Sequence, residues 1–155
     1  MTLHNDDSSW ICGLMGENSD ALGFIPKPTV THQYVRLGRS ILQRDTKGRR
    51  VGYLLHGSIS QGGPVSIAQA CIQYEKRLLD FGTQVVDTLI QRAEHQQASS
   101  IRLRCAEELE ALRFWQQLGF RIEHWLDVDN RRNRRIAVLS RPLVLGLFGT
   151  DDDDG

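Results

Sequence analysis

The amino-acid sequence predicts an α/β domain in which a central sheet is flanked by helices. An apolar run over residues 65–73 is followed by a charged turn and then by an amphipathic segment over 82–98. An alternating strand pattern at 101–105 leads into a second amphipathic segment over 109–118. Strands that alternate with helices along one chain are typical of α/β folds.

The first forty residues carry helix and turn signals. Apolar residues at helical spacing predict a short helix over 8–17, and two aspartates precede it, where the helix dipole favours acids. Two prolines hold residues 23–28 out of helical geometry. A second helix is predicted from position 29 or 31 to 37, ending at Gly38.

The strands are predicted from alternation, β-branched residues and turn residues. Residues 40–44 and 50–56 predict a hairpin, because a glycine lies in their short connection. The apolar run at 65–73 suits a strand covered on both faces. Residues 120–128 and 135–141 predict a final hairpin around an Arg/Asn-rich turn.

The two later helices each have one apolar face. In the segment 82–98 this face comprises Val85, Val86, Leu89, Ile90 and Ala93. In the segment 109–118, which Gly119 ends, the residues expected to face the core are Ala111, Phe114, Trp115 and Leu118.

The bulk composition limits the class of protein. We expect one domain over residues 1–142, followed by an apolar and then acidic tail over 143–155. Lys plus Arg equals Asp plus Glu at 19 each, so net charge gives no argument for nucleic acid or a membrane as partner. The basic run 131–135 is either a solvated hairpin tip or a recruitment site for a phosphate or an acidic partner.

The cysteines and the N-terminus favour a cytoplasmic protein. Cys12, Cys71 and Cys105 are isolated in apolar stretches, which is typical of reduced buried thiols, and no Cys/His spacing suggests a metal site. The N-terminus lacks a secretory pattern, and no apolar run approaches the length that spans a bilayer.

The turn before the segment 82–98 reads Arg77-Leu78-Leu79-Asp80-Phe81-Gly82. Backbone N–H groups at a helix start can approach phosphate oxygens closely where the residues are small. Asp80 is unfavourable in an anion-binding turn, because its carboxylate would repel phosphate if the side chain pointed inward. If the side chain points outward, Asp80 acts as an N-cap of the helix. The alternative is an ordinary charged turn that caps a helix.

In its order and spacing of motifs, the sequence resembles the GNAT superfamily, the acyl-coenzyme A-dependent N-acetyltransferases, over about residues 22–138. The turn matches that family's Arg/Gln-x-x-Gly-x-Gly/Ala pattern at Arg77 and Gly82, with Asp80 replacing the first glycine. Three further stretches carry the resemblance: Gly23-Phe24-Ile25-Pro26, Val51-Gly52-Tyr53-Leu54-Leu55 and Phe114-Trp115-Gln116-Gln117-Leu118-Gly119-Phe120.

The resemblance implies a GNAT fold with a mixed, mostly antiparallel sheet and a shortened N-terminus, which has room for little of the family's opening strand and helix. It implies acetyl-CoA as cosubstrate and an amine as acceptor, without a metal. The residues it assigns to acetyl-CoA are Cys71, Ile72 and Gln73, whose strand would pair with the pantetheine arm, and Arg77, Leu78, Leu79, Asp80, Phe81, Gly82 and Thr83, which would hold the pyrophosphate. Those it assigns to the acceptor pocket are Phe24, Ile25 and Trp115.

No catalytic residue is identified from the sequence. Trp115 stands where the family often has a tyrosine acid, and an indole N–H cannot serve as such an acid, so Trp115 is expected to pack. Glu107 and Glu108 are either candidate bases or helix-start acids, and Tyr74 is either a phenol near the cofactor or a surface aromatic.

Three functions follow from this reading. The first is acetyl transfer from acetyl-CoA to a primary amine. The second is a catalytically weakened GNAT-fold module that binds acyl-CoA or a subunit partner, which Asp80, Trp115 and the shortened N-terminus favour. The third is a homodimer in which the apolar segment 143–148 and an exposed sheet edge complete each other.

Overall fold

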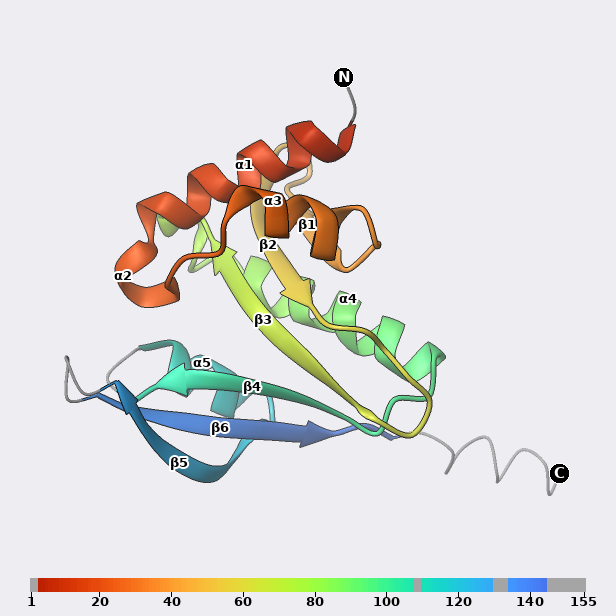
Figure 1. Ribbon diagram of the computed structural model, residues 1–155, viewed down its shortest axis with the longest axis vertical. Helices are drawn as coiled ribbons and strands as arrows, with labels where there is room; N and C mark the ends of the chain where they lie inside the picture. Colours follow the sequence, from red (N-terminus) through yellow and green to blue (C-terminus); the bar gives the residue numbers. More distant parts are fainter. Residues whose placement is uncertain (1–2, 108–109, 130–133, 145–155) are drawn as a thin grey trace, which may run out of the picture. The chain divides into compact units, whose positions relative to one another are not determined.

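The computed structural model describes residues 3–107, 110–129 and 134–144, and its elements form two compact units that are interleaved in sequence (Figure 1). The first unit comprises the chain up to Ser58 together with Ala68–Leu89. The second comprises Ile59–Ile67 and the chain from Ile90 onward. Within the described residues six strands have the order β1-β2-β3-β4-β6-β5. Strands β3 and β4 pair in parallel, whereas β1 with β2, β4 with β6 and β5 with β6 pair antiparallel.

The first unit opens with helices and continues with strands. Its helices are α1 (Leu3–Glu17), α2 (Ser19–Leu22), α3 (Lys27–Thr29) and the π-helical η1 (Val30–Val35). They are followed by β1 (Ser40–Arg44), β2 (Arg50–His56), the second half of β3 (Pro64–Ile72), the short 3₁₀ helix η2 (Tyr74–Lys76) and most of α4 (Phe81–His95). The hairpin predicted at 40–44 and 50–56 is confirmed with those bounds.

The core of the first unit lies between α1, η1 and the strands. Its buried residues are Ile11, Leu14, Met15, Val30, Val35, Tyr53, Leu55 and Cys71. Arg50 of β2 donates to Asp6 at 2.5 Å and to Asp7 at 2.7 Å, so an ion-pair cluster ties the first turns of α1 to β2.

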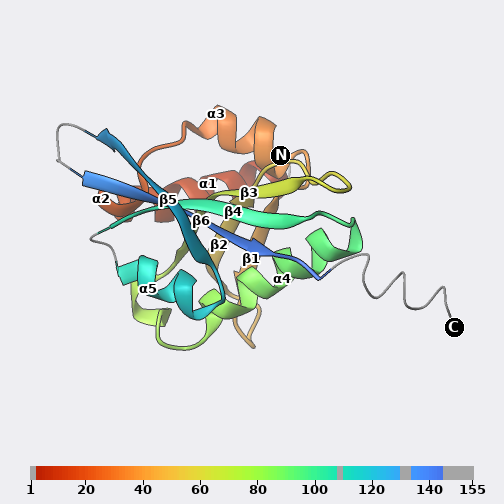
Figure 2. The same ribbon diagram turned by 90° about the horizontal axis from the view of Figure 1, so that it is seen from below.

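The second unit is a sheet with a helix on one face. Its elements after the first half of β3 and the end of α4 are β4 (Ser100–Ala106), α5 (Glu110–Gln117), β5 (Arg121–Asp129) and β6 (Arg134–Pro142). Figures 1 and 2 show α5 beside β4, β6 and β5 on one side only. The predicted helix at 109–118 and the final hairpin are confirmed within about two residues at each end, with Gly119 in the left-handed region at φ +91°.

Three sequence predictions are wrong in detail. Helix α1 begins at Leu3, so the N-terminal region holds a full 15-residue helix rather than a short one from residue 8. Strand β3 was expected to be covered on both faces, but it buries only alternate residues. Ser66 and Ala68 are exposed and Ala70 is half-buried, so the other face of the strand is not fully covered. Ala111 is exposed, since the core-facing stripe of α5 is narrower than predicted and centres on Trp115.

Other predictions fall partly outside the described residues. The start of the tail is described: Leu143 is buried and its N–H donates to the Ser99 carbonyl at 3.0 Å, whereas Val144 is exposed. Glu108, most of the basic run 131–135 and the rest of the tail lie outside the described residues. No helix in the described part of the chain is long and apolar enough to cross a membrane.

Candidate functional site: the turn between β3 and α4

The turn predicted to bind an anion connects the end of β3 to the start of α4 in the first unit. The Gln73 N–H donates to the Val51 carbonyl at 2.8 Å, which anchors the turn to β2. The Lys76 N–H then donates to the Gln73 carbonyl at 2.9 Å, closing the 3₁₀ turn of η2. The turn therefore starts from a fixed point on the sheet.

Asp80 has a left-handed backbone with φ +72°. In the described chain only Gln97 shares a positive φ among the non-glycine residues. This is the conformation that glycine adopts without cost, so the backbone shape suited to glycine is kept although the residue is aspartate. The Asp80 carbonyl accepts from the Gln84 N–H at 3.1 Å, which places Asp80 at the start of α4.

The Asp80 side chain does not cap the helix. It is exposed, and it makes no hydrogen bond or ion pair with another described residue. Asp80 therefore occupies the position of an outward-pointing N-cap, as one alternative predicted, but its side chain does not make the hydrogen bond of an N-cap to a described residue.

The first turn of α4 carries unsatisfied backbone donors. None of the described residues accepts a hydrogen bond from the N–H groups of Phe81, Gly82 and Thr83. Such N–H groups, together with the positive end of the helix dipole, favour an anion. The donors fit a phosphate group, and the nearby Asp80 carboxylate weakens that fit by like-charge repulsion.

Arg77 is engaged within the protein rather than held free for an anion. Its Nε donates to the Ile72 carbonyl at 2.9 Å, and its Nη2 donates to Asn18 Oδ1 at 2.6 Å. The guanidinium also lies 5.4 Å from the centre of the exposed Tyr74 ring. Arg77 thus fastens the turn to the end of β3 and to the C-terminal end of α1.

The C-terminal half of β3 has one hydrogen-bonding edge toward β2. Its other edge extends past Pro64–Ser66, the stretch of β3 that pairs with β4. Because Gln73 pairs toward β2 and strand residues alternate, Cys71 points its backbone groups the same way, whereas Ala70 and Ile72 point theirs to the other edge. The pairing with β4 runs from Pro64 to Ser66. Ala70, which sequence reasoning did not assign, is therefore better placed than Cys71 to pair with a ligand, and the parity of the strand was the missing signal.

Cys71 itself is a buried core thiol. Burial raises its pKa, and the neighbouring Arg77 guanidinium opposes that rise. A raised pKa disfavours the thiolate, so the prediction that Cys71 packs rather than reacts agrees with its surroundings.

Gly52 allows β2 to approach the end of β3 closely. A Cβ at this position would lie 2.3 Å from Ile72 Cδ1 and 2.8 Å from the Cys71 carbonyl oxygen. Only glycine leaves room for that approach, so Gly52 helps to position the strand end that leads into the turn.

The residues expected on the acceptor side of the first unit lie in the loop after α2. Phe24 is 78% exposed, and the N–H of the half-buried Ile25 lies 3.3 Å from Met15 Sδ. Beneath the loop, buried Gln69 donates to the Leu22 carbonyl at 3.3 Å. The loop is therefore held from below while Phe24 faces solvent.

Gln69 also accepts a hydrogen bond from the Tyr53 hydroxyl at 2.8 Å. Burial strongly raises the pKa of Tyr53, and the thiols Cys71 and Cys12 add a smaller effect in the same direction. Tyr53 is thus a neutral donor that orients the Gln69 amide.

Trp115 lies in the second unit and packs in an aromatic cluster. It is 7% exposed, and its ring meets Phe114 and Phe120 edge-on, at centroid distances of 5.1 and 5.3 Å. This geometry suits packing. A role for Trp115 together with Phe24 and Ile25 in an acceptor pocket stays a prediction.

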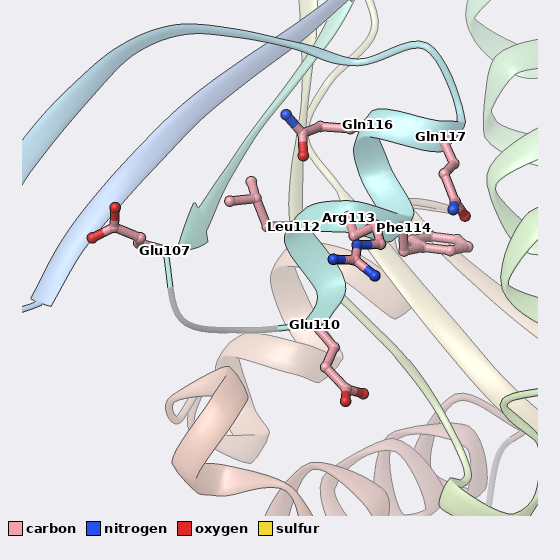
Figure 3. A pocket seen from close by; sticks show the side chains of 7 residues that line it. All are labelled: Glu107, Glu110, Leu112, Arg113, Phe114, Gln116 and Gln117. Carbon is pink, nitrogen blue, oxygen red and sulfur yellow. The ribbon is translucent and has the colours of Figure 1, made fainter.

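The second unit contains an open pocket of about 650 Å³ along α5 (Figure 3). Its lining residues are Glu107, Glu110, Leu112, Arg113, Phe114, Gln116 and Gln117. Glu107, considered as a base from the sequence, forms an ion pair with Arg135 at 3.3 Å and is about half exposed. Glu107 and Arg135 therefore form an exposed ion pair at the surface of the second unit. No group of three or more metal-ligating side chains occurs within the described ranges.

Comparisons with known proteins support the fold. No protein-family model and no curated protein sequence matches the chain. The structure is similar to that of Ard1 from Thermoplasma volcanium, with TM-score 0.76, 15% identity, and 90% of this chain and 93% of that one covered. It is also similar to the ribosomal-protein-S18-alanine N-acetyltransferase from Escherichia coli, with TM-score 0.75, 12% identity and 94% of each chain covered.

A third similar structure is an aminoglycoside 6'-N-acetyltransferase complexed with coenzyme A, with TM-score 0.71, 11% identity, and 88% of this chain and 91% of that one covered. Proteins of this fold, including an acetyltransferase of the GNAT family, match over most of their own length. The chain has the GNAT fold, an α/β fold with a mixed sheet flanked by helices.

Proposed function

We propose that this protein transfers an acetyl group from acetyl-CoA to a primary amine. The observation that carries the proposal is the left-handed backbone at Asp80, followed by the N–H groups of Phe81, Gly82 and Thr83, from which no described residue accepts a hydrogen bond. A turn that keeps the glycine-like shape without a glycine is suited to the phosphate contact that small residues provide in the GNAT pattern.

The proposed binding mode uses backbone groups in the first unit. The N–H groups of residues 81–83 would hold the pyrophosphate, and the outer edge of β3 at Ala70 and Ile72 would pair with the amides of the pantetheine arm. The Ile72 carbonyl already accepts from Arg77, so Ile72 would contribute mainly its N–H. Arg77 would support the turn without touching phosphate.

The proposed reaction depends mainly on positioning. The amine nitrogen attacks the thioester carbonyl carbon and forms the C–N bond of a tetrahedral intermediate. The intermediate collapses as the C–S bond breaks and the thiolate leaves, and the amine proton passes to solvent and then to the thiolate. Backbone N–H groups that polarise the carbonyl stabilise the tetrahedral intermediate. Similar structures named as N-acetyltransferases support this reaction class.

A second candidate is an acyl-CoA-binding module with weakened catalysis. It is favoured by the exposed Asp80 carboxylate beside the free N–H groups and by the engagement of Arg77 with Asn18. The carboxylate lowers the positive potential available to a pyrophosphate, and the hydrogen bond to Asn18 occupies a donor of Arg77.

Titration calorimetry with acetyl-CoA and with coenzyme A tests both candidates. We expect a dissociation constant of roughly 1–100 µM for acetyl-CoA. No heat at millimolar ligand would reject both. Binding without acetyl transfer to any of a panel of small amines and peptide N-termini would leave the binding module.

Two variants separate the charge of Asp80 from its conformation. Asp80→Asn removes the charge and keeps the shape, and Asp80→Gly removes the charge and eases the left-handed backbone. We expect both to tighten coenzyme A binding by about five- to tenfold, since about 1 kcal/mol of repulsion is lost. Asp87→Asn, on the exposed face of α4, is the matched control and should leave the affinity unchanged.

A further inference from the structure

One face of the second unit's sheet carries exposed basic side chains. On β4 the buried residues Ile101, Leu103 and Cys105 alternate with the exposed residues Arg102 and Arg104. The buried set lies on the side of the core, so the two arginines lie on the opposite face.

The strand register extends this face across β6 to β5. Arg102 lies opposite Ser140, which lies opposite Arg121, and Arg104 lies opposite Val138, which lies opposite His124. Directly paired residues point to the same side of a sheet. Arg102, Arg104, Arg121 and His124 therefore form one basic face.

The four side chains of the basic face are exposed, and within the described residues none of them has an ion pair or a side-chain hydrogen bond. The exposed acid Glu123 lies between Arg121 and His124 in chain order, at the irregularity of β5. Net charge conceals this arrangement, because the chain as a whole is neutral.

The spacing of the basic face matches an extended polypeptide. Arg102 and Arg104 are two residues apart on one strand, or about 6.6 Å, and Arg102 and Arg121 are two strands apart, or about 9.6 Å. In an extended peptide, acids at every second position place carboxylates on one side at the same interval of about 6.6–7 Å. Guanidinium groups bind carboxylates in bidentate fashion.

The neighbouring side chains favour a polypeptide over a nucleic acid. Further along the same face, the register brings together Ala106, Ile136 and Leu126, which are aliphatic and, except for Ala106, partly exposed. Aliphatic side chains can pack against those of a peptide, whereas single-stranded nucleic acid is held by a series of aromatic platforms, and His124 is the one aromatic ring among the described residues of this face.

We infer that the basic face of β4, β6 and β5 binds an acidic polypeptide segment in extended conformation, with carboxylates on Arg102, Arg104 and Arg121. The inference goes beyond the proposed acetyl transfer and does not depend on it, because every residue it uses belongs to the second unit. Binding is electrostatic and exposed, so it is weak and sensitive to salt.

Fluorescence anisotropy of the full chain with a labelled peptide of about twelve residues, with Glu at alternate positions, tests the inference. We expect a dissociation constant of roughly 10–100 µM at about 0.05 M salt, weakened at least about tenfold at about 0.5 M salt. The Arg102→Gln/Arg121→Gln double variant should lose about tenfold in affinity. Lys47→Gln, in the exposed turn between β1 and β2, changes charge elsewhere and should bind like wild type.

Three results would overturn the inference. The first is absence of binding at low salt. The second is equal loss in the double variant and in Lys47→Gln, which would indicate a non-specific charge effect. The third is tighter binding of an oligouridylate of equal charge than of the peptide, which would assign the face to nucleic acid. Unchanged circular dichroism and thermal midpoint of the variants establish that the fold is intact.

Discussion

At the scale of single residues, the region of the proposed site depends on two backbone geometries that glycine adopts most easily. Asp80 keeps a backbone shape natural to glycine, and Gly52 keeps a distance between strands that no side chain permits. The Gly-Tyr pair at 52–53 serves both geometry and hydrogen bonding, since Tyr53 supports Gln69 beneath the Phe24 loop.

Gly52→Ala should destabilise the protein by about 1–3 kcal/mol, because the new methyl group would overlap the Ile72 side chain and the Cys71 carbonyl. Urea denaturation measures the change. Gly13→Ala in α1 is the control, because a Cβ there meets no atom within 4 Å and alanine favours the helix. Equal stability of the Gly52→Ala protein and wild type would contradict the close approach.

Tyr53→Phe should cost about 1–3 kcal/mol, because buried Gln69 Oε1 loses its donor. The same hydrogen bond predicts a pH dependence. The folded pKa of Tyr53 is raised above its unfolded value of about 10, so its stabilising effect is complete below that value and is lost as pH rises above it.

The wild-type protein should therefore lose stability above about pH 10 more steeply than Tyr53→Phe does. Denaturation midpoints measured across alkaline pH, with tyrosinate absorbance followed in parallel, check this. Parallel curves for the two proteins would show that Tyr53 titrates as freely when folded as when unfolded.

At the scale of elements, a hydrogen bond between two side chains links the end of α1 to the β3–α4 turn. Arg77 donates to Asn18, and Asn18 Nδ2 donates to the Leu14 carbonyl near the C-terminal end of α1. A double-mutant cycle of Arg77→Ala and Asn18→Ala should give a coupling of about 0.5–1 kcal/mol in unfolding free energy. Strictly additive effects would show that the pair does not hold the turn to α1.

The elements also show what the sequence could and could not predict. Both hairpins and the two later helices follow from local periodicity and turn residues, and their bounds agree with the structure within a few residues. The first turns of α1 were missed, because their residues are mostly polar and the ion pairs of Arg50 with Asp6 and Asp7 join residues far apart in sequence. Such long-range pairing leaves no periodic signal.

The site was predictable as a stretch of sequence but not as a geometry. The motif predicted the place of the turn in the sequence. It did not predict that Asp80 adopts the left-handed conformation or that Arg77 donates a hydrogen bond to Asn18. The basic face was not predictable, since its residues are brought together by the register of three strands. Registers depend on tertiary packing that one strand's pattern does not specify.

At the scale of the whole molecule, the segment after β6 has two possible roles, one in the stability of the fold and one in assembly, and shortened chains distinguish them. A chain ending at Pro142 should be less stable than one ending at Val144 by about 2–3 kcal/mol, because it loses buried Leu143 and its hydrogen bond to Ser99. Thermal and urea denaturation compare the two. Equal stability would mean that Leu143 contributes no net packing.

Light scattering on the same two chains and on the full chain tests the homodimer hypothesis. If the apolar segment 143–148 completes a sheet edge of a second copy, the full chain should have twice the mass of a protomer and both shortened chains the mass of one. A single protomer's mass for all three would reject that assembly.

The division of the chain into interleaved units has a consequence for its synthesis. The first unit is complete only when residues 68–89 have been synthesised, and these follow residues 59–67, which belong to the second unit. Residues 59–67 in turn pack with the chain from Ile90 onward, which is synthesised last. During synthesis on the ribosome, therefore, neither unit can fold completely before residue 89 has been made. Residues 59–67 stay without the rest of their unit until the later segments have been translated. Slow translation after residue 67, or a break there, should expose that stretch to chaperones and proteases for longer than a pause after residue 144.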